Sequence, residues 1–457
     1  MDVNIEPVSP VTQELSAYIQ GALAATLPEE VREKGKHHLL DTVAAMVSGS
    51  RLKPGAMAID YVRSLGGAPS CTVIGSDIVT NAVNAALANG MHAHADETDD
   101  SHIVGRFHPG CGIVPGAYAA AELGRRSGAD LLKAVILGYD IGVRFNLSMG
   151  PRKLYAGGHS THSVGTLFGA SAAAAALLGH SDRQVRHQLS YTIQQASGVQ
   201  CWVRDDQHIE KAFDFAGMTA RNALAAATMV AAGFTGVDDA LSGTNNFFSA
   251  FSQDPRPDEL AAGLGHRFEI LEATIKKWCV GSPCQGALDA ITLLMHEHGL
   301  RAEDVESMVA ELPDDRAHLV DNRPMPNINV QQLVALALVD GGLTFEAAHD
   351  YGRMSDPVVS DLRGRIELVH SAELTTAQPP RQVILRGRTK DGRDLTHRTH
   401  AVKGTPANPM TRQEVTEKAA DLVMPIIGDQ RGRKLIDTML AIEDLDNVLD
   451  LRPLLQF

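Results

Sequence analysis

Aromatic side chains are scarce in this chain: they make up 5% of its 457 residues, whereas alanine is abundant. Such a composition favours closely packed helices over a β-sandwich, because strands are enriched in aromatic and β-branched side chains. The chain is also too long for one simple hydrophobic core, so we expect two domains.

Cysteine is rare as well, and its positions are scattered: Cys71, Cys111, Cys201, Cys279 and Cys284. The number is odd and no CxxC pair occurs. This pattern indicates reduced thiols in a cytoplasmic protein and argues against a disulfide framework or a structural zinc site.

Positive charge is in deficit, and the net charge of the chain is −14. Non-specific binding of nucleic acid needs basic patches, so we expect no nucleic-acid partner. A small anionic substrate is compatible with this charge, because a few buried cations can dominate one cleft. No uninterrupted apolar run approaches membrane-spanning length, and the start of the chain, MDVNIEPVSP, has no signal-peptide core. We therefore expect no membrane partner and a cytoplasmic location.

Three common catalytic signatures are absent from the sequence: the phosphate loop GxxxxGK(S/T), the nucleophile motif GxSxG and the zinc motif HExxH. Nucleotide binding and serine-hydrolase chemistry are therefore unsupported. Cys111 follows His108 in HPGCG, but nothing else in the sequence marks it as a thiolate nucleophile.

Groups that transfer protons are concentrated in one stretch, HAHADETDDSHIVGRFHPGCGIVP, at residues 92–115. It holds three histidines and four acidic side chains within residues 92–102, followed by Arg106 and His108. Such density beside a loop broken by glycine and proline exceeds what a fold requires. Loops on a rigid scaffold are where catalytic groups tend to lie.

The stretch allows two kinds of chemistry. His92, His94, Asp96 and Glu97 could supply metal ligands, although their spacing is not that of a helical zinc motif. An acid–base cluster without metal, acting on a carboxylate substrate, is the interpretation that we prefer. Lysine and histidine cations can hold carboxylates and stabilise the negative charge that develops when a proton leaves the adjacent carbon.

The candidates for this proton chemistry are the 94–108 cluster, His159, Lys211 and the Lys276-Lys277 pair. Each is weak when taken alone. Lys211 follows a run of polar residues, and a solvated surface lysine is its ordinary alternative.

Helical periodicity dominates up to about residue 265, and strand-like runs follow. The polar stretch 201–217 is expected to be a loop, and a helix is expected to restart over 115–122. The Asp391-Gly392 pair lies between two strand-like runs and predicts a β-hairpin. Helical patterns return after residue 411, so we expect a mainly α fold: a large all-helical domain from residues 1–266 and 403–457, with a smaller α+β lid domain inserted at 267–402.

Motifs spread over essentially the whole chain resemble those of the MmgE/PrpD family. The family's HALDxDDTH-like and HPG motifs correspond to residues 94–102 and 108–110, and its later motifs correspond to residues 159–166, 195–198, 211–217 and 276–290.

The resemblance implies a homodimeric enzyme without metal or other cofactor, whose active site lies in a cleft between a helical domain and an α+β lid. By motif position it implies the catalytic residues Glu97, His108, His159, Lys211 and Lys276. It implies substrate-binding residues at His94, Ser101, Arg106 and Gln285, where Arg106 is brought toward the site by one extra residue before HPG.

The sequence departs from the family pattern at several of these positions. Glu97 replaces the usual aspartate, Ser101 a threonine and Gln285 a histidine. Val320 stands where family decarboxylases carry a tyrosine, which disfavours decarboxylation. We therefore expect a lyase, most simply a dehydratase of a small di- or tricarboxylic acid. The alternatives are an epimerase or isomerase, a decarboxylase, and a non-catalytic binding protein with the family fold.

Overall fold

The computed structural model describes residues 7–457, so most of the tail that the sequence predicts over residues 1–8 lies outside the described residues. Helices account for 61% of the structure and strands for 9%, which confirms the mainly α fold class.

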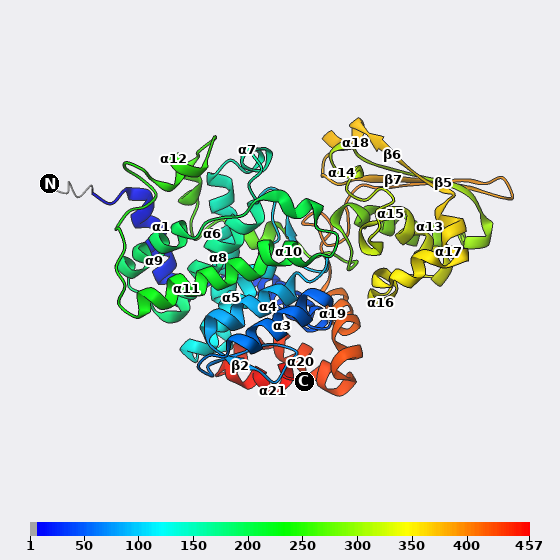
Figure 1. Ribbon diagram of the computed structural model, residues 1–457. Coiled ribbons are helices and arrows are strands. Elements are labelled where there is room, and N and C mark those ends of the chain that lie inside the picture. The colour runs from blue at the N-terminus through cyan, green and yellow to red at the C-terminus, as the bar shows by residue number, and fades with distance from the viewer. Residues whose placement is uncertain (1–6) are drawn as a thin grey trace. The chain divides into compact units, whose positions relative to one another are not determined.

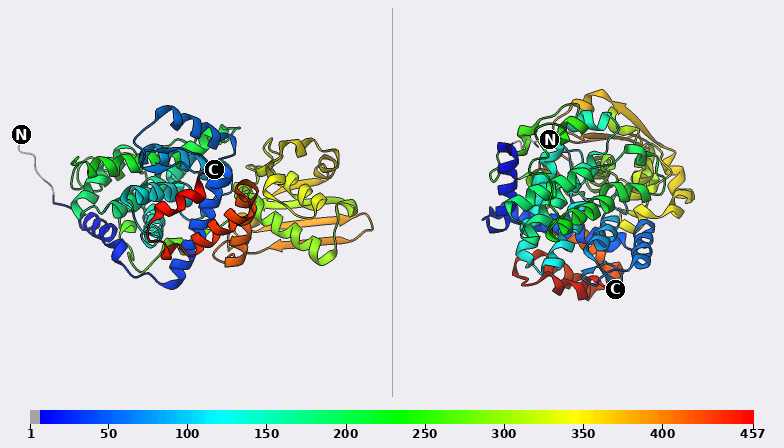
Figure 2. Two further views of the ribbon diagram at one scale, coloured as in Figure 1. Left: turned by 90° about the horizontal axis from the view of Figure 1, so that it is seen from below. Right: turned by 60° about the vertical axis from the view of Figure 1, so that its left-hand side comes forward.

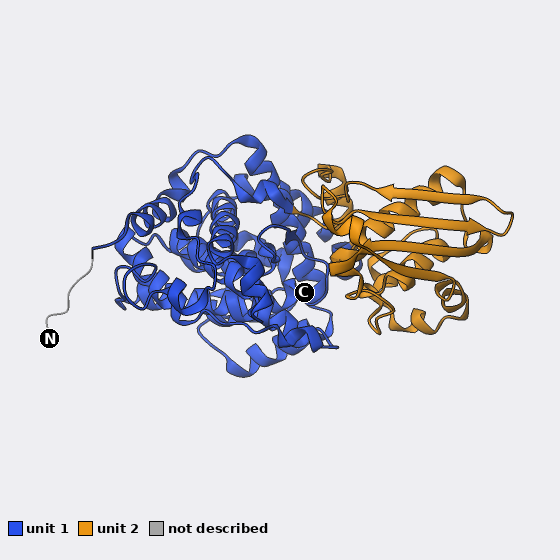
Figure 3. Cartoon of the chain, turned by 90° about the horizontal axis from the view of Figure 1, so that it is seen from above, with its two compact units in different colours: residues 1–273, 422–457 blue, residues 274–421 orange. Residues whose placement is uncertain are grey.

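Contacts between residues divide the chain into two compact units (Figure 3). Unit 1 runs to Ala273 and resumes at Leu422, and unit 2 comprises Thr274–Asp421. The sequence boundaries at 266 and 402 follow the change from helical to strand-like patterns, whereas these boundaries follow the density of contacts.

Helix α8 (Thr161–Leu178) is the core helix of unit 1 and packs against α5 (Pro109–Gly124), α6 (Gly128–Ser148) and α11 (Met218–Ala231). Contrary to the expectation from the sequence that no apolar run approaches membrane-spanning length, this helix is long and apolar enough to cross a membrane, but 94% of it is buried inside the chain. The closeness of α6 follows from its small residues: a Cβ atom added at Gly169 would lie 2.4 Å from the carbonyl oxygen of Gly138. The close helix packing that the alanine-rich sequence predicts is thus confirmed.

The remaining helices of unit 1 surround this core, with three short strands beside them, of which the first two pair with each other (Figure 1). These elements are α1 (Pro10–Gly21), α2 (Glu29–Gly49), α3 (Lys53–Leu65), β1 (Cys71–Thr72), β2 (Val79–Thr80), α4 (Ala82–Ala93), β3 (Ser101–His102), α7 (Pro151–Ala156), α9 (Asp182–Gln194), α10 (Ile209–Ala212), α12 (Phe247–Phe251), α20 (Asp429–Leu440) and α21 (Arg452–Leu455).

The C-terminal helices complete unit 1, and α20 packs against α2 near the other end of the chain (Figure 2). Glu443 lies 3.0 Å from the Arg32 guanidinium and 2.6 Å from the Lys36 ammonium of α2. Arg452 donates a hydrogen bond of 3.1 Å to Glu122 of α5. Both ends of the chain therefore contribute to the helical scaffold.

Unit 2 is built on a four-stranded sheet in the order β6-β5-β7-β8. Strand β5 pairs in parallel with β6 and antiparallel with β7, which is antiparallel to β8. Its elements are α13 (Gln285–His298), β5 (Val305–Pro313), α14 (Asp314–Ala317), α15 (Val330–Asp340), α16 (Phe345–His349), α17 (Pro357–Arg363), β6 (Ile366–Ser371), α18 (Ala372–Thr376), β7 (Val383–Thr389) and β8 (Asp394–Thr399), while α19 (Arg412–Ile427) crosses the boundary of the units.

The predicted hairpin between β7 and β8 is confirmed. Thr389 N donates to Arg393 O over 2.9 Å, and Gly392 closes the turn with φ +88°, a conformation that glycine adopts without strain. Buried side chains of β7 alternate with exposed ones near its end, and they pack into a core shared with α13 and α15.

Two local predictions are wrong. Residues 201–217 are helical from Ile209 onward. The prediction of a loop failed because polar neighbours hide the helical spacing of the buried residues Ala212, Phe215 and Ala216. Helix α5 begins at Pro109 and not at Pro115, which lies inside the helix. Both prolines satisfy the first-turn signal, and the earlier one starts the helix.

Candidate active site

The polar stretch 94–108 connects α4 to α5, and most of it is buried. Helix α4 ends at Ala93, and the residue that caps it, His94, leaves helical geometry with φ −121° and ψ 34°. The acidic residues that follow are 5% exposed or less: Asp96, Glu97, Asp99 and Asp100. Burying a carboxylate is costly unless it is paired or hydrogen-bonded, so their partners define this site.

Asp99 lies between two imidazoles. Its Oδ2 is 3.0 Å from Nδ1 of His108, with which it forms a hydrogen bond, and its Oδ1 is 3.0 Å from Nδ1 of His94. An ionised carboxylate only accepts hydrogen bonds, so a neutral His108 carries its proton at Nδ1, and Nε2 is the nitrogen that gains and loses a second proton. The His108 side chain is 12% exposed, so the imidazole is not sealed from solvent.

Asp100 anchors the same loop to the scaffold. It accepts hydrogen bonds from the Tyr139 hydroxyl at 2.6 Å and from Gly110 N at 2.9 Å, and it lies 2.7 Å from His38 Nδ1. Burial lowers the pKa of His38 to about 4 despite this carboxylate. The loop is therefore tied to α2, to α6 and to the first turn of α5.

Glu97 forms an ion pair with Lys211 of α10. The Lys211 side chain is 18% exposed, and its ammonium lies 5.1 Å from the ring centre of Phe215 and 5.7 Å from that of Trp202. Lys211 is thus not the solvated surface lysine of the ordinary alternative. It is a cation held on an aromatic wall, where it can exchange its carboxylate partner for one on a ligand.

Phe215 lies at the centre of a cluster of imidazoles. It is part of a π-helical turn, Phe213–Gly217, of a kind often found at functional sites. The His94 ring stacks on it at 4.4 Å and the His162 ring at 3.6 Å, and His108 packs at 5.5 Å. The turn is pressed against α4, since a Cβ atom at Gly90 would lie 2.8 Å from Ala216.

His162 and His208 complete the cluster. The ring of His162 is 5.2 Å from that of His108, and the ring of His208 is 5.0 Å from that of His94. Burial, reinforced by neighbouring positive groups, lowers the pKa of both His162 and His208 well below the usual value. Both imidazoles are therefore neutral near pH 7.

Asp214 lies in the same π-helical turn and titrates near neutrality. Burial raises its pKa to about 7, although the hydroxyls of Ser160 and Ser163 donate hydrogen bonds to it. These bonds join the turn to the first residues of α8.

The structure brings His94, Glu97, His108 and Lys211 together, whereas the ring contacts of Arg106 and His159, two other predicted residues of unit 1, are with residues outside this cluster. Ser101 is buried in β3, and the Arg106 guanidinium lies 4.9 Å from the ring centre of Tyr155 in α7. His159 pairs through its backbone with Val199, and its ring is 6.4 Å from that of Phe251.

Lys276 and Gln285, the remaining predicted residues, belong to unit 2. The Gln285 amide nitrogen donates to Trp278 O at 2.8 Å and to Val280 O at 3.0 Å, and the amide oxygen accepts from Trp278 N. Both amide protons are used inside the unit. Gln285 thus holds the segment after Lys276, and only its oxygen could contact a substrate.

His208, Phe215 and the bridging role of Asp99 were missed from the sequence, and His162 was covered there only as part of the 159–166 motif. His162 lies three residues after the family histidine at 159, and His208 lies in the stretch expected to be a loop. A histidine three residues before Lys211 was the available signal.

Two sets of side chains in this cluster could hold a metal ion: His94, Asp99 and Cys111, and His94, Glu97 and His208. In each set the possible ligand atoms lie within 4.8 Å of one another.

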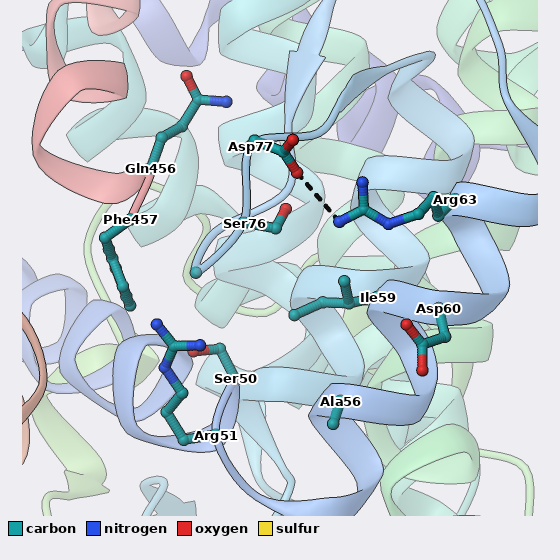
Figure 4. A pocket seen from close by; sticks show the side chains of 11 residues that line it. Ser50, Arg51, Ala56, Ile59, Asp60, Arg63, Ser76, Asp77, Gln456 and Phe457 are labelled. Carbon is teal, nitrogen blue, oxygen red and sulfur yellow. Dashed lines mark hydrogen bonds and ion pairs between the residues drawn. The ribbon is translucent and has the colours of Figure 1, made fainter.

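A cavity of 590 Å³ elsewhere in unit 1 is less suited to proton chemistry (Figure 4). Asp77 points toward Arg63, which it binds at 3.0 Å, and the Arg51 guanidinium lies 5.0 Å from the ring centre of Phe457. Among the described residues that line it there is no histidine and none of the predicted site residues.

Comparison with known proteins covers nearly all of the chain. It is 27% identical to the cis-aconitate decarboxylase-like protein oryM of Aspergillus oryzae, over 98% of both chains. It is 24% identical to the cis-aconitate decarboxylases of Aspergillus terreus and Homo sapiens, over 98% of this chain and over 96% and 94% of theirs. Residues 13–260 match the MmgE/PrpD N-terminal domain and residues 278–444 match the MmgE/PrpD C-terminal domain. The chain therefore belongs to the MmgE/PrpD family, as its motifs predict.

Proposed function

We propose that this chain is a lyase that removes the proton next to a carboxylate of a small di- or tricarboxylic acid, and that its reaction is a dehydration. The observation that carries the proposal is that two pairs of side chains lie beside Phe215. One is the ion pair of Glu97 and Lys211, and the other is the His108 imidazole with its hydrogen bond to Asp99. Elimination of water needs a base and an acid within reach of one substrate, and these groups supply both.

In the proposed reaction, Lys211 exchanges Glu97 for a substrate carboxylate. The freed Glu97 carboxylate accepts the proton from the adjacent carbon, and Lys211 stabilises the negative charge that develops on the bound carboxylate. The electron pair of the broken C–H bond forms the alkene as the C–O bond breaks. His108 enters this step as the imidazolium, with protons on both Nδ1 and Nε2. It gives the Nε2 proton to the departing hydroxyl, which leaves as water, and the neutral imidazole that remains keeps its proton at Nδ1, facing Asp99.

Two other predicted residues have supporting parts in this proposal, by their motif positions. Lys276 would hold a second carboxylate of the substrate, and His159 is the alternative base. Dimer formation is likewise proposed, on the strength of the family resemblance alone.

Decarboxylation is the second candidate, because relatives that match this chain over 98% of its length are named cis-aconitate decarboxylases. Decarboxylation needs a proton donor for the carbon that loses carbon dioxide, and it needs no leaving hydroxyl. Val320 argues against it in this chain, since it cannot supply the hydroxyl of the tyrosine that family decarboxylases carry there.

Purified protein incubated with citrate, 2-methylcitrate and cis-aconitate distinguishes the candidates. Alkene absorbance appearing from a hydroxy acid supports dehydration, whereas carbon dioxide released from cis-aconitate supports decarboxylation. Exchange of substrate protons with deuterated water, without net conversion, indicates an epimerase. Lys211→Ala should abolish the activity and the exposed Lys153→Ala, on α7, should not. The absence of all three signals would overturn the proposal and favour a non-catalytic role.

A further inference from the structure

Two imidazoles in the cluster have buried nitrogen atoms without a hydrogen-bond partner. Within residues 7–457, Nε2 of His94 and Nε2 of His208 make no hydrogen bond. His94 is 0% exposed and His208 is 6% exposed. Unsatisfied buried polar atoms are uncommon and costly, so they call for an explanation such as an ion that the protein can take up.

The backbone at His208 supports this explanation. His208 adopts φ +60° in the left-handed region, which is uncommon for residues other than glycine, although histidine, asparagine and aspartate adopt it more often than the rest. The strained conformation precedes α10 and presents the imidazole to His94, with the rings 5.0 Å apart. Strain that delivers an unpaired ligand atom to a site indicates a function for that atom.

From these observations we propose that His94, Glu97 and His208 form a binding site for a divalent transition-metal ion, and that occupation of this site inhibits the enzyme. Two histidines and a glutamate are the protein ligands of many zinc sites, with the fourth position left to water. The ligand atoms lie within 4.8 Å of one another, whereas ligands around tetrahedral zinc stand about 3.4 Å apart, so side-chain shifts of about 1 Å close the site.

Inhibition follows from what the ion must displace. Glu97 is paired with the Lys211 ammonium, and a metal ion that takes Glu97 competes with that cation. It also removes Glu97, the proposed base, from proton transfer. The inhibition thus rests on the proposed function, whereas the binding does not.

The other set of possible ligands, His94, Asp99 and Cys111, is less suitable. Asp99 already holds His108 at 3.0 Å, and the Cys111 thiol lies 3.1 Å from the carbonyl oxygen of His108. Binding there would break the hydrogen bond that orients His108.

The test is a zinc titration of the metal-stripped full-length protein in competition with a chromophoric chelator. We expect one tight site in the parent protein. His208→Asn removes a ligand while keeping a residue that tolerates φ +60°, and it should weaken binding by more than about tenfold. Lys211→Met removes the competing cation, and it should tighten binding several-fold.

The matched control is His180→Asn, since His180 is another buried histidine whose two ring nitrogens make no hydrogen bond within the described chain. It should leave the zinc affinity unchanged. Circular dichroism and thermal unfolding report whether each variant is folded. If His208→Asn does not fold, the zinc affinity of Lys211→Met still tests the proposal.

Three results would overturn the proposal: no tight zinc site in the parent, equal affinity in parent and His208→Asn, or loss of zinc in Cys111→Ser instead. Zinc should also inhibit turnover in the parent at the concentrations at which it binds, with recovery after EDTA. Turnover without zinc binding would refute only the metal site, and zinc binding without any turnover would refute only the proposed lyase.

Discussion

Asp99 accepts a hydrogen bond of 3.0 Å from Nδ1 of His108 at a position where the carboxylate is 0% exposed. A buried carboxylate behind an imidazole does two things: it selects the tautomer with the proton on Nδ1, and it stabilises the positive charge when Nε2 gains a proton. His108 can therefore deliver a proton at Nε2 while remaining fixed in orientation.

Asp99→Asn should lower kcat by about 100-fold or more, because the amide can donate to Nδ1 and so favours the wrong tautomer. The pH profile of kcat should shift as well, since the charged imidazole loses its carboxylate. KM should change less than kcat, because Asp99 acts through His108 and not on the substrate. An unchanged kcat and pH profile, in a protein that unfolds at the parent's temperature, would show that Asp99 only packs the loop.

The ion pair between Glu97 and Lys211 should matter for stability as well as for catalysis. Lys211→Met removes the cation that is paired with a side chain only 7% exposed, and it should lower the free energy of unfolding by about 3 kcal/mol. Adding Glu97→Gln removes the charge left behind and should restore much of this loss. Urea unfolding of the parent, both single variants and the double variant measures the coupling.

The double variant should remain inactive even where its stability recovers. Additive losses of stability, with no recovery in the double variant, would mean that the two side chains do not depend on each other.

The fold was largely predictable because its signals are local. Helical spacing of apolar residues marks α2 and α6, and Asp391-Gly392 marks the hairpin of unit 2. The prediction failed at 201–217, where Lys211 and its polar neighbours suggested a loop. The helix there depends on Phe215 being buried by α4 and α8, and those contacts are distant in sequence.

The candidate site was predictable only in part, for a similar reason. The density of acidic and histidine side chains identified the 94–108 loop, and motif positions identified Lys211. The partners that decide the chemistry come from elsewhere: His38 and Tyr139 hold Asp100 from two other helices. No pattern within the loop shows which of its carboxylates is a base and which holds an imidazole, since that depends on these distant contacts.

Gly169→Ala should destabilise unit 1 by about 1–3 kcal/mol. The added methyl group would lie 2.4 Å from the Gly138 carbonyl oxygen and 2.7 Å from the Ile113 side chain, so α6 and α8 must separate. The control is Gly21→Ala at the end of α1, where nothing lies within 4 Å of the added atom. Urea unfolding should show the loss for Gly169→Ala alone, and equal effects of the two changes would contradict close packing of these helices.

Asp214 should make the protein less stable as the pH rises from about 4 to about 7. Its pKa is about 7 in the folded protein and 3.8 in the reference state, so between these values the folded state holds a proton that the unfolded state has lost. Stability must therefore fall as pH rises from about 4 to about 7, by about 2–4 kcal/mol in all. Asp214→Asn stays neutral and should not show this fall.

The measurement is the difference in unfolding free energy between Asp214→Asn and the parent, taken by urea unfolding at a series of pH values. The difference should move in favour of the variant as pH rises, because the parent must then bury a carboxylate against the hydroxyls of Ser160 and Ser163. The exposed Asp446→Asn serves as control and should give a flat difference. A flat difference for Asp214→Asn as well would mean that the Asp214 carboxyl is ionised throughout, and that the π-helical turn beside Lys211 carries a permanent negative charge.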